Sequence, residues 1–288
     1  MARAAVNLPT IAHVAVLVVV DNTTDRPDLL GEHGLALWIE ADGHRVLLDT
    51  GQGEALEHNA PRLGLALAQI DAVVLSHGHY DHTGGLPFVL DRAAKARVFA
   101  HPAAVGGRFS RRDAPPHKAI GLPEEAGISL EERGPKVTWT EGPTKVVPGV
   151  WVTGAIPRRT AFEDVGGDFY TDEACAQPDA VPDDQAVFLR TERGLVVLCG
   201  CAHAGLVNTL DFVTDLAGED SVYAVIGGLH LGRASPERLE RTAEAVERYG
   251  VQVLAPAHCT GETAARFFAK RFVDTCVGCG AGTWFALT

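Results

Sequence analysis

The spacing of apolar and polar residues divides the first hundred residues of the chain into short alternating elements. Continuous or alternating apolar runs predict buried strands over residues 13–20, 35–40, 44–51, 71–75 and 97–100. Apolar positions at helical spacing predict helices over 53–64 and 87–96. Strands that alternate with helices in this way are typical of α/β proteins.

The same alternation returns after residue 185. Apolar runs predict strands over 185–191, 194–200, 221–228, 251–256 and 283–287. Helical spacing predicts helices over 206–216, 235–250 and 262–272. Ser235 followed by Pro236 is a favourable helix start. No linker separates the two halves, so we expect one domain over residues 1–288.

Residues 101–182 have a different pattern. They contain much of the proline of the chain, many charges and only short apolar runs. We interpret this region as short strands and an irregular lid over a site, not as a second domain.

Composition excludes several classes of function. The 288 residues are 46% hydrophobic and carry a formal net charge of −12, which disfavours nucleic acid as a partner. The apolar run near the N-terminus ends at Asp21 without a cleavage pattern, and no run approaches the ~20 apolar residues of a membrane span. The six cysteines lack a disulfide-scaffold pattern. We therefore expect a cytoplasmic protein with reduced thiols and no membrane association, and the oligomeric state stays open.

The densest chemical signal is the stretch SHGHYDHTGG at 76–85, directly after an apolar strand. His77, His79, Asp81 and His82 supply imidazole and carboxylate donors, which Zn²⁺ and similar cations select. Four donors in six residues split naturally into two pairs, which suggests two adjacent metal ions. The two glycines that end the stretch are expected to let the chain turn into a helix beside them.

This stretch resembles the H-x-H-x-D-H signature of metallo-β-lactamase-fold hydrolases, and LLDTG at 47–51 resembles an element that precedes it there. Further segments resemble one branch, the proteins similar to 7,8-dihydropterin-6-yl-methyl-4-(β-D-ribofuranosyl)aminobenzene 5′-phosphate synthase. These segments are VDNTTD (20–25), EHGLALWIE (32–40), TGAIPR (153–158), CGCAHAGLVNT (199–209), GGLHL (227–231) and PAHCTG (256–261). The resemblance implies a four-layer αββα sandwich with metals at the edge of its two sheets.

The resemblance also implies a ligand set. His77 and His79 would hold one ion, Asp81 and His82 the other, and His258 matches the last ligand of the second ion. In its middle part this sequence differs from the ligand pattern of the family. AIPRRT stands where the family pattern has a histidine, and GCAH stands where it has a bridging aspartate. We predict that His203 reaches the first ion and that Cys201 occupies roughly the bridging position.

Other residues are assigned roles around the metals. Asp49 is expected to orient a histidine ligand by a hydrogen bond. His230, after a strand and two glycines, is a candidate ligand, acid/base group or substrate contact, with a structural histidine as the alternative. Tyr80, His33 and Arg158 are candidate substrate contacts, with packing under the loop as the favoured alternative for Tyr80. Arg158 is included because an arginine can bind an anionic group through two hydrogen bonds. For a second basic run, from Arg108 to Lys118, binding of an anionic group and an ordinary solvated surface are equally good interpretations.

We therefore expect a metal-dependent hydrolase that uses two divalent transition-metal ions, Zn²⁺ first, with Mn²⁺ or Fe²⁺ as alternatives. Metal-bound hydroxide would attack a small anionic ester, lactone or phosphodiester, with Asp81 as ligand and proton acceptor. One alternative is a synthase that forms a C–N bond between a pterin and an arylamine phosphate. The other is a non-enzymatic metal or redox sensor that uses Cys199, Cys201 and Cys259.

Overall fold

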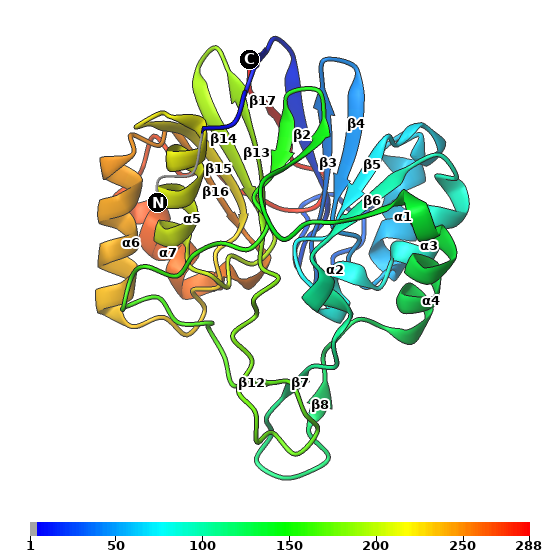
Figure 1. Ribbon diagram of the computed structural model, residues 1–288. Coiled ribbons are helices and arrows are strands. Elements are labelled where there is room, and N and C mark those ends of the chain that lie inside the picture. Colours follow the sequence, from blue (N-terminus) through cyan, green and yellow to red (C-terminus); the bar gives the residue numbers. More distant parts are fainter. Residues whose placement is uncertain (1–4) are drawn as a thin grey trace.

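The computed structural model describes residues 5–288 and has two large sheets packed face to face, with helices on both outer faces (Figure 1). This arrangement confirms the predicted four-layer αββα sandwich. A core of branched aliphatic side chains from both sheets fills the space between them, including Val16, Ile39, Val187 and Ile226. These side chains come from strands that are buried on both faces, which explains why the strands read as continuous apolar runs.

The first sheet has the strand order β17-β2-β3-β4-β5-β6-β9. Its strands are β17 (Trp284–Ala286), β2 (Val14–Val20), β3 (Ala36–Ala41), β4 (His44–Leu48), β5 (Ala72–Val74), β6 (Arg97–Ala100) and β9 (Val137–Trp139). The strands from β4 to β9 run parallel. Their carboxyl ends therefore lie at one edge of the sheet.

The second sheet has the order β10-β11-β13-β14-β15-β16, and β1 (Thr10–Ile11) pairs with β13. The other strands are β10 (Thr144–Val147), β11 (Val150–Val152), β13 (Ala186–Thr191), β14 (Gly194–Cys199), β15 (Val222–Gly228) and β16 (Val253–Ala257). β14, β15 and β16 are parallel, so this sheet also gathers strand ends at one edge.

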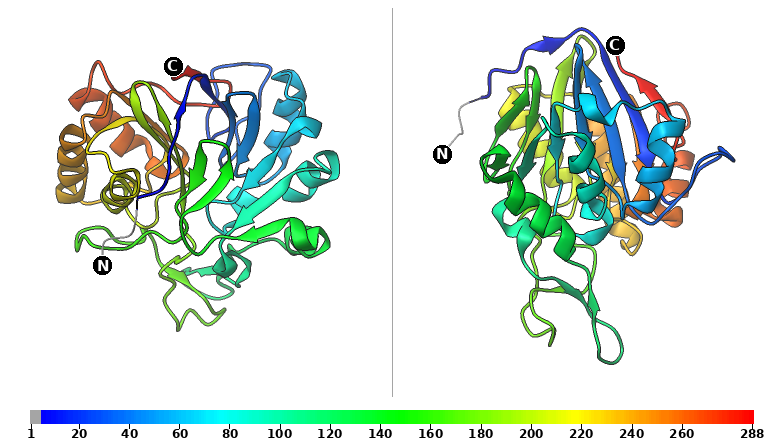
Figure 2. Two further views of the ribbon diagram at one scale, coloured as in Figure 1. Left: turned by 45° about the horizontal axis from the view of Figure 1, so that its top comes forward. Right: turned by 90° about the vertical axis from the view of Figure 1, so that its right-hand side faces the viewer.

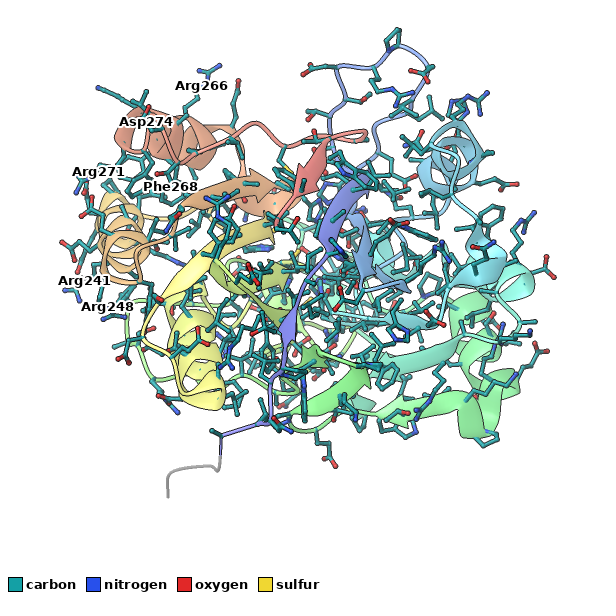
Figure 3. All side chains as sticks on the ribbon, turned by 90° about the horizontal axis from the view of Figure 1, so that it is seen from above. Arg241, Arg248, Arg266, Phe268, Arg271 and Asp274 are labelled. Atoms are coloured by element: carbon teal, nitrogen blue, oxygen red, sulfur yellow. The ribbon has the colours of Figure 1, made fainter. Side chains whose placement is uncertain are left out.

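Helices cover the outer face of each sheet. The first sheet packs against α1 (Glu54–Arg62), α3 (Leu86–Arg92) and α4 (Glu124–Arg133), and the second against α5 (Leu206–Ala217), α6 (Pro236–Arg248) and α7 (Glu262–Arg271). Ser235 caps α6 by accepting a hydrogen bond from the Arg238 amide, as its sequence predicts. Figure 3 shows Arg241 and Arg248 of α6 and Arg266 and Arg271 of α7 at the rim of the molecule, whereas Phe268 is fully buried.

A small third sheet projects below the sandwich, away from both helical layers (Figure 1 and Figure 2). It consists of β7 (Phe109–Ser110), β8 (Lys118–Ala119) and β12 (Phe169–Tyr170), in the order β12-β7-β8. We call this sheet the flap. It comes entirely from the region that the sequence marks as irregular.

The rest of residues 101–182 is more regular than expected. The strands β9, β10 and β11 complete the two main sheets, and α4 is a helix that the sequence analysis did not predict. Short single turns connect the larger elements: α2 (Tyr80–Thr83), η1 (Leu67–Gln69), η2 (Pro102–Val105), η3 (Gly134–Lys136) and η4 (His258–Thr260). Within residues 5–288, no helix combines the length and the hydropathy needed to cross a bilayer.

Candidate metal centre

The candidate metal-binding residues lie where parallel strands of both sheets end. His77 follows β5, His203 follows β14, His230 follows β15 and His258 follows β16. Carboxyl ends of parallel strands gather at one edge of a sheet, and here the edges of both sheets meet. Residues from the two halves of the chain thus come together at this shared edge.

One group consists of three buried imidazoles from His77, His79 and His203. His77 Nε2 lies 2.9 Å from His79 Nδ1, and the His203 Nδ1–H donates to the Val165 carbonyl at 2.8 Å. Burial, together with the mutual repulsion of neighbouring imidazoles, holds the pKa values of all three well below their ordinary value. The rings are therefore neutral near pH 7, so each has one nitrogen lone pair that can bind a cation.

A second group combines Asp81, His258 and His33. The Asp81 Oδ2 atom lies 3.4 Å from His258 Nε2 and 3.1 Å from His33 Nε2. Burial opposes charge on the Asp81 carboxyl, yet hydrogen bonds from His258 and His33 hold its pKa well below its ordinary value. The carboxylate is thus ionised and faces two imidazoles.

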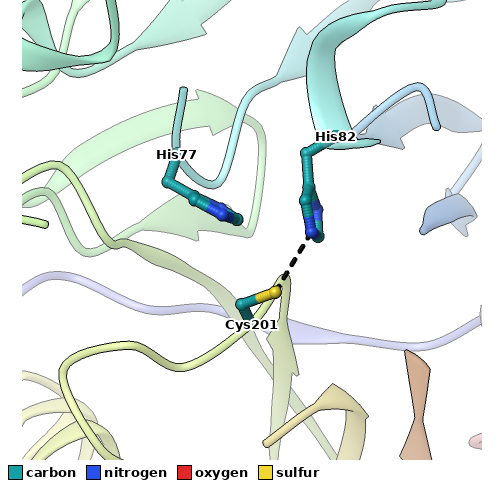
Figure 4. Close-up of side chains that lie close together, drawn as sticks. All are labelled: His77, His82 and Cys201. Carbon is teal, nitrogen blue, oxygen red and sulfur yellow. Dashed lines mark hydrogen bonds between the residues drawn. The ribbon is translucent and has the colours of Figure 1, made fainter. Parts of the chain in front are cut away.

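His82 and Cys201 lie between the two groups. His82 Nε2 is 3.2 Å from His258 Nε2 and 3.1 Å from Cys201 Sγ, and the sulfur also lies near a ring nitrogen of His77 (Figure 4). Cys201 therefore lies close to His77 and His82, which belong to different predicted ligand pairs.

Asp49 orients His82 and Ser76 by hydrogen bonds. Its carboxylate accepts hydrogen bonds from Ser76 Oγ at 2.6 Å and from His82 Nδ1 at 2.7 Å. Although burial disfavours charge on His82, the Asp49 carboxylate raises the pKa of His82 to about 9. The same contact fixes the proton on Nδ1 and leaves Nε2 facing Cys201 and His258.

Two residues that position the ligands were not predicted from the sequence. Asn22 Oδ1 lies 2.8 Å from His258 Nδ1, which leaves His258 Nε2 facing Asp81. Asp183 accepts a hydrogen bond from the Gly78 amide, between His77 and His79. Gly78 itself has no room for a side chain, because a Cβ atom would lie 2.0 Å from the Ala104 carbonyl oxygen.

Gly84 and Gly85 do not have the role in turning the chain that the sequence predicts for them. Their φ angles of −64° and −80° are ordinary helical values that any residue adopts. A Cβ atom on either residue would instead lie within 2.4 Å of the carbonyl oxygens of Gln52 and Thr50. These glycines therefore permit close packing of two backbones, not an unusual turn.

A pocket with a volume of about 190 Å³ opens above the histidine groups. Its lining includes the predicted contacts His33, Tyr80 and His230, and the flap contributes Lys118 and Phe169. Lys118 Nζ donates to the Tyr80 hydroxyl at 2.6 Å. Among the described residues, Lys118 is the only lysine or arginine in the lining.

The structure does not bring Arg158 to this pocket. Its guanidinium donates to the Ala180 carbonyl and lies near Asp184 and Glu163. After β11 the chain runs to α5, where the Arg159 and Thr160 amides donate to Asn208 Oδ1. Arg158, six positions past the end of the strand, therefore lies beside α5. The cation that faces the pocket comes from the flap instead.

The donor set suits divalent cations. His79 Nε2 and His203 Nε2 are buried and have no hydrogen-bond partner among the described residues. Several neutral imidazoles packed against one another with unpaired nitrogens are costly unless a cation binds them. Imidazole, carboxylate and thiolate donors together favour borderline transition metals over Mg²⁺ or Ca²⁺.

Comparison with known proteins agrees with this fold. The family model of the metallo-beta-lactamase superfamily matches residues 30–155. A 7,8-dihydropterin-6-methyl-4-(beta-D-ribofuranosyl)-aminobenzene-5'-phosphate synthase from Methanocaldococcus jannaschii is 31% identical over 254 residues, which cover 84% of this chain and 86% of the relative.

Solved structures show the same fold. The crystal structure of Tm1679, a metal-dependent hydrolase of the beta-lactamase superfamily, matches 96% of this chain and 100% of that chain with a TM-score of 0.81 and 28% identity. A diphosphatase from the PhnP family matches 96% of this chain and 98% of that chain with a TM-score of 0.52 and 12% identity. The chain therefore belongs to the metallo-beta-lactamase superfamily.

Proposed function

We propose that the protein is a metal-dependent hydrolase that acts on a small anionic ester, lactone or phosphodiester. The observation that carries this proposal is the convergence of two donor groups at the floor of one pocket. His77, His79 and His203 would hold one divalent ion. Asp81, His82 and His258 would hold the other, with Cys201 between them.

Divalent ions bound there would lower the pKa of a coordinated water and polarise a carbonyl or phosphoryl oxygen of the substrate. The protein supplies orientation and charge around that chemistry. Asp49 and Asn22 fix the ring orientations of His82 and His258. Asp81 is ionised and faces the pocket, so its free carboxylate lone pairs are available to accept a proton.

An anionic substrate is supported by Lys118. Its ammonium lies on the pocket wall, held by the Tyr80 hydroxyl and 4.4 Å from the centre of the Tyr80 ring. Phe169 and Ile120 offer an apolar surface in the same pocket. We therefore expect a substrate with an apolar body and an anionic group that pairs with Lys118, in place of the Arg158 contact predicted from the sequence.

The test uses purified protein loaded with Zn²⁺ or Mn²⁺ and a panel of phosphodiesters, lactones, and neutral and anionic aryl esters. His79→Ala should abolish hydrolysis. Lys118→Ala should raise KM for anionic substrates roughly tenfold, as expected for losing about 1.4 kcal/mol, and leave neutral esters unaffected. Lys145→Ala, on an exposed position of β10, is the matched control. Hydrolysis that survives metal removal or the His79 substitution would refute the proposal.

A second candidate function is a synthase that forms a C–N bond. The relative from M. jannaschii, whose similarity extends over most of both chains, favours it. In that reaction an arylamine nitrogen would attack the methylene carbon of a pterin pyrophosphate, and pyrophosphate would leave. Incubation of the loaded protein with a pterin pyrophosphate and an aminobenzene ribofuranosyl phosphate would yield the coupled product and pyrophosphate. Absence of both, in protein that hydrolyses other substrates, would exclude this candidate.

A further inference from the structure

Three residues beside the histidine groups form a separate cluster of metal-binding side chains. Cys201, His230 and Cys259 each offer one donor atom, and these atoms lie within 4.8 Å of one another. Each residue follows a different parallel strand, β14, β15 or β16. All three line the pocket, so the cluster is reachable from solvent.

One atom of this cluster is unsatisfied. The His230 Nδ1 atom is buried and has no hydrogen-bond partner among the described residues. The ring packs against the His203 ring with a centroid distance of 4.2 Å, so it lies directly beside the histidine groups. A buried ring nitrogen without a partner costs free energy, and a bound cation would remove that cost.

The backbone around the cluster is shaped to hold these side chains. His230 has a φ angle of 46°, a left-handed conformation that is unfavourable for a histidine. Its amide donates to Cys259 Sγ at 3.3 Å, and such a hydrogen bond stabilises a thiolate. Two glycines leave the necessary space, because a Cβ atom on Gly228 would lie 2.7 Å from Cys259 Sγ and one on Gly166 would lie 2.0 Å from the His230 ring.

We propose that Cys201, His230 and Cys259 form a third cation site, which binds a soft or borderline ion of the Zn²⁺ and Cd²⁺ class. Two thiolates and one imidazole select such ions over Mg²⁺, Ca²⁺ and Mn²⁺. Cys201 Sγ also lies within reach of His77 and His82, so its thiolate bridges the third ion to the histidine groups. Under this assignment His230 is a ligand and not an acid/base group.

Ordinary packing of two buried thiols is the competing explanation. Thiol packing accounts for the contact of Cys259 Sγ with the Cys201 carbonyl at 3.7 Å. Thiol packing does not explain the strained backbone of His230, nor why its Nδ1 atom lacks a hydrogen-bond partner among the described residues. It also predicts that Cys259 has no influence on metal content, which separates the two explanations experimentally.

The experiment titrates metal-free, fully reduced protein with Cd²⁺. Bound cadmium is counted by mass spectrometry, and ultraviolet absorption reports thiolate-to-metal charge transfer. The wild-type chain should bind three ions, two at the histidine groups and one at Cys201, His230 and Cys259, and the Cys259→Ser and His230→Ala variants should bind two. Cys259→Ser should also lose about half of the charge-transfer absorption, because one of two thiolates is removed. Cys276→Ser, which changes a half-buried cysteine outside the cluster, should match the wild type.

A measurement on the unmodified chain protects the test against misfolded variants. Cys259 lines the pocket and is only partly buried, so iodoacetamide should label it in the metal-free protein. The third equivalent of Cd²⁺ should suppress that labelling at least tenfold, as peptide mass spectrometry would show. The proposal is overturned if Cys259→Ser binds as many ions as the wild type, or if labelling of Cys259 ignores the third equivalent. Neither outcome depends on whether the protein hydrolyses any ester.

Discussion

The Asp49→Asn substitution tests how the protein orients its ligands. The Asp49 carboxylate is fully buried and accepts three hydrogen bonds, from the Ser76 amide, the Ser76 hydroxyl and the His82 Nδ1–H. An asparagine keeps one oxygen acceptor and replaces the other with an NH₂ donor. Because the Ser76 amide can only donate, the asparagine oxygen would face that amide and the NH₂ group would face His82 Nδ1. His82 would then have to give up its Nδ1 proton and keep the one on Nε2, the nitrogen that faces Cys201 and His258.

The expected loss follows from this change of tautomer. Removing the hydrogen-bond partner of a histidine ligand typically lowers metal affinity about 10- to 100-fold, or about 1.4–2.8 kcal/mol. The loss should fall on the ion held by His82. Among the described residues, no hydrogen bond joins Asp49 directly to His77, His79 or His203, and Ser76 Oγ connects Asp49 to His77 Nδ1, so the ion they hold should change little.

Competition with a chromophoric chelator measures both affinities in one titration. Asp91→Asn is the control, because the Asp91 side chain is 81% exposed and pairs with its neighbour Arg92, away from the metal ligands. Selective weakening of one ion supports the reasoning. Equal weakening of both ions, or unchanged affinity for both, would refute it.

Further predictions concern the turn at 183–184 and its neighbours. Burial raises the pKa of Asp184 to about 7, so the folded chain holds a proton that the unfolded chain releases near pH 4. The stability from this proton is complete at low pH and is lost as pH rises through 7, and Asp184→Asn should remove that dependence. Urea unfolding of both proteins from pH 4 to 8 checks this, and parallel profiles would contradict it. Asp183→Asn should destabilise the fold by about 3 kcal/mol in urea unfolding, because it weakens a buried ion pair with Arg108, which then keeps only Asp179. It should also lower metal occupancy through the Gly78 amide, and wild-type stability with full occupancy would refute both effects.

The sequence predicts the main sheets and helices well, because each buried strand and each amphipathic helix carries its own periodicity. Helix α4 escaped prediction for a physical reason. Only Ala126 and Leu130 are buried in it, Gly127 lowers its intrinsic propensity, and Ile128 is 48% exposed. A helix with so narrow a buried face leaves little periodic signal.

The residues of the candidate site were likewise predictable only where the local sequence carries a signal. Residues 77–82 are recognisable because the donors are contiguous in sequence. Asn22 and Asp183 were not, because their hydrogen bonds reach His258 and Gly78 across 236 and 105 residues, a distance that local patterns do not encode. Arg158 was assigned from a neighbouring motif, and only the path of the chain after β11 shows that it lies elsewhere.

The division of the ligands between two sheets couples cation binding to stability. His77, His79, Asp81 and His82 follow a strand of the first sheet, whereas His203 and His258 follow strands of the second. An ion that binds this folded arrangement and not the unfolded chain stabilises it by about 2.7 kcal/mol at a concentration one hundred times its dissociation constant. The core between the sheets does not depend on the ligands, since it is built from apolar side chains that are mostly aliphatic. Chelation should therefore lower the unfolding temperature while the far-ultraviolet circular dichroism of the folded protein is retained. A chain that lost its secondary structure on chelation would show that the ions, and not the aliphatic core, hold the two sheets together.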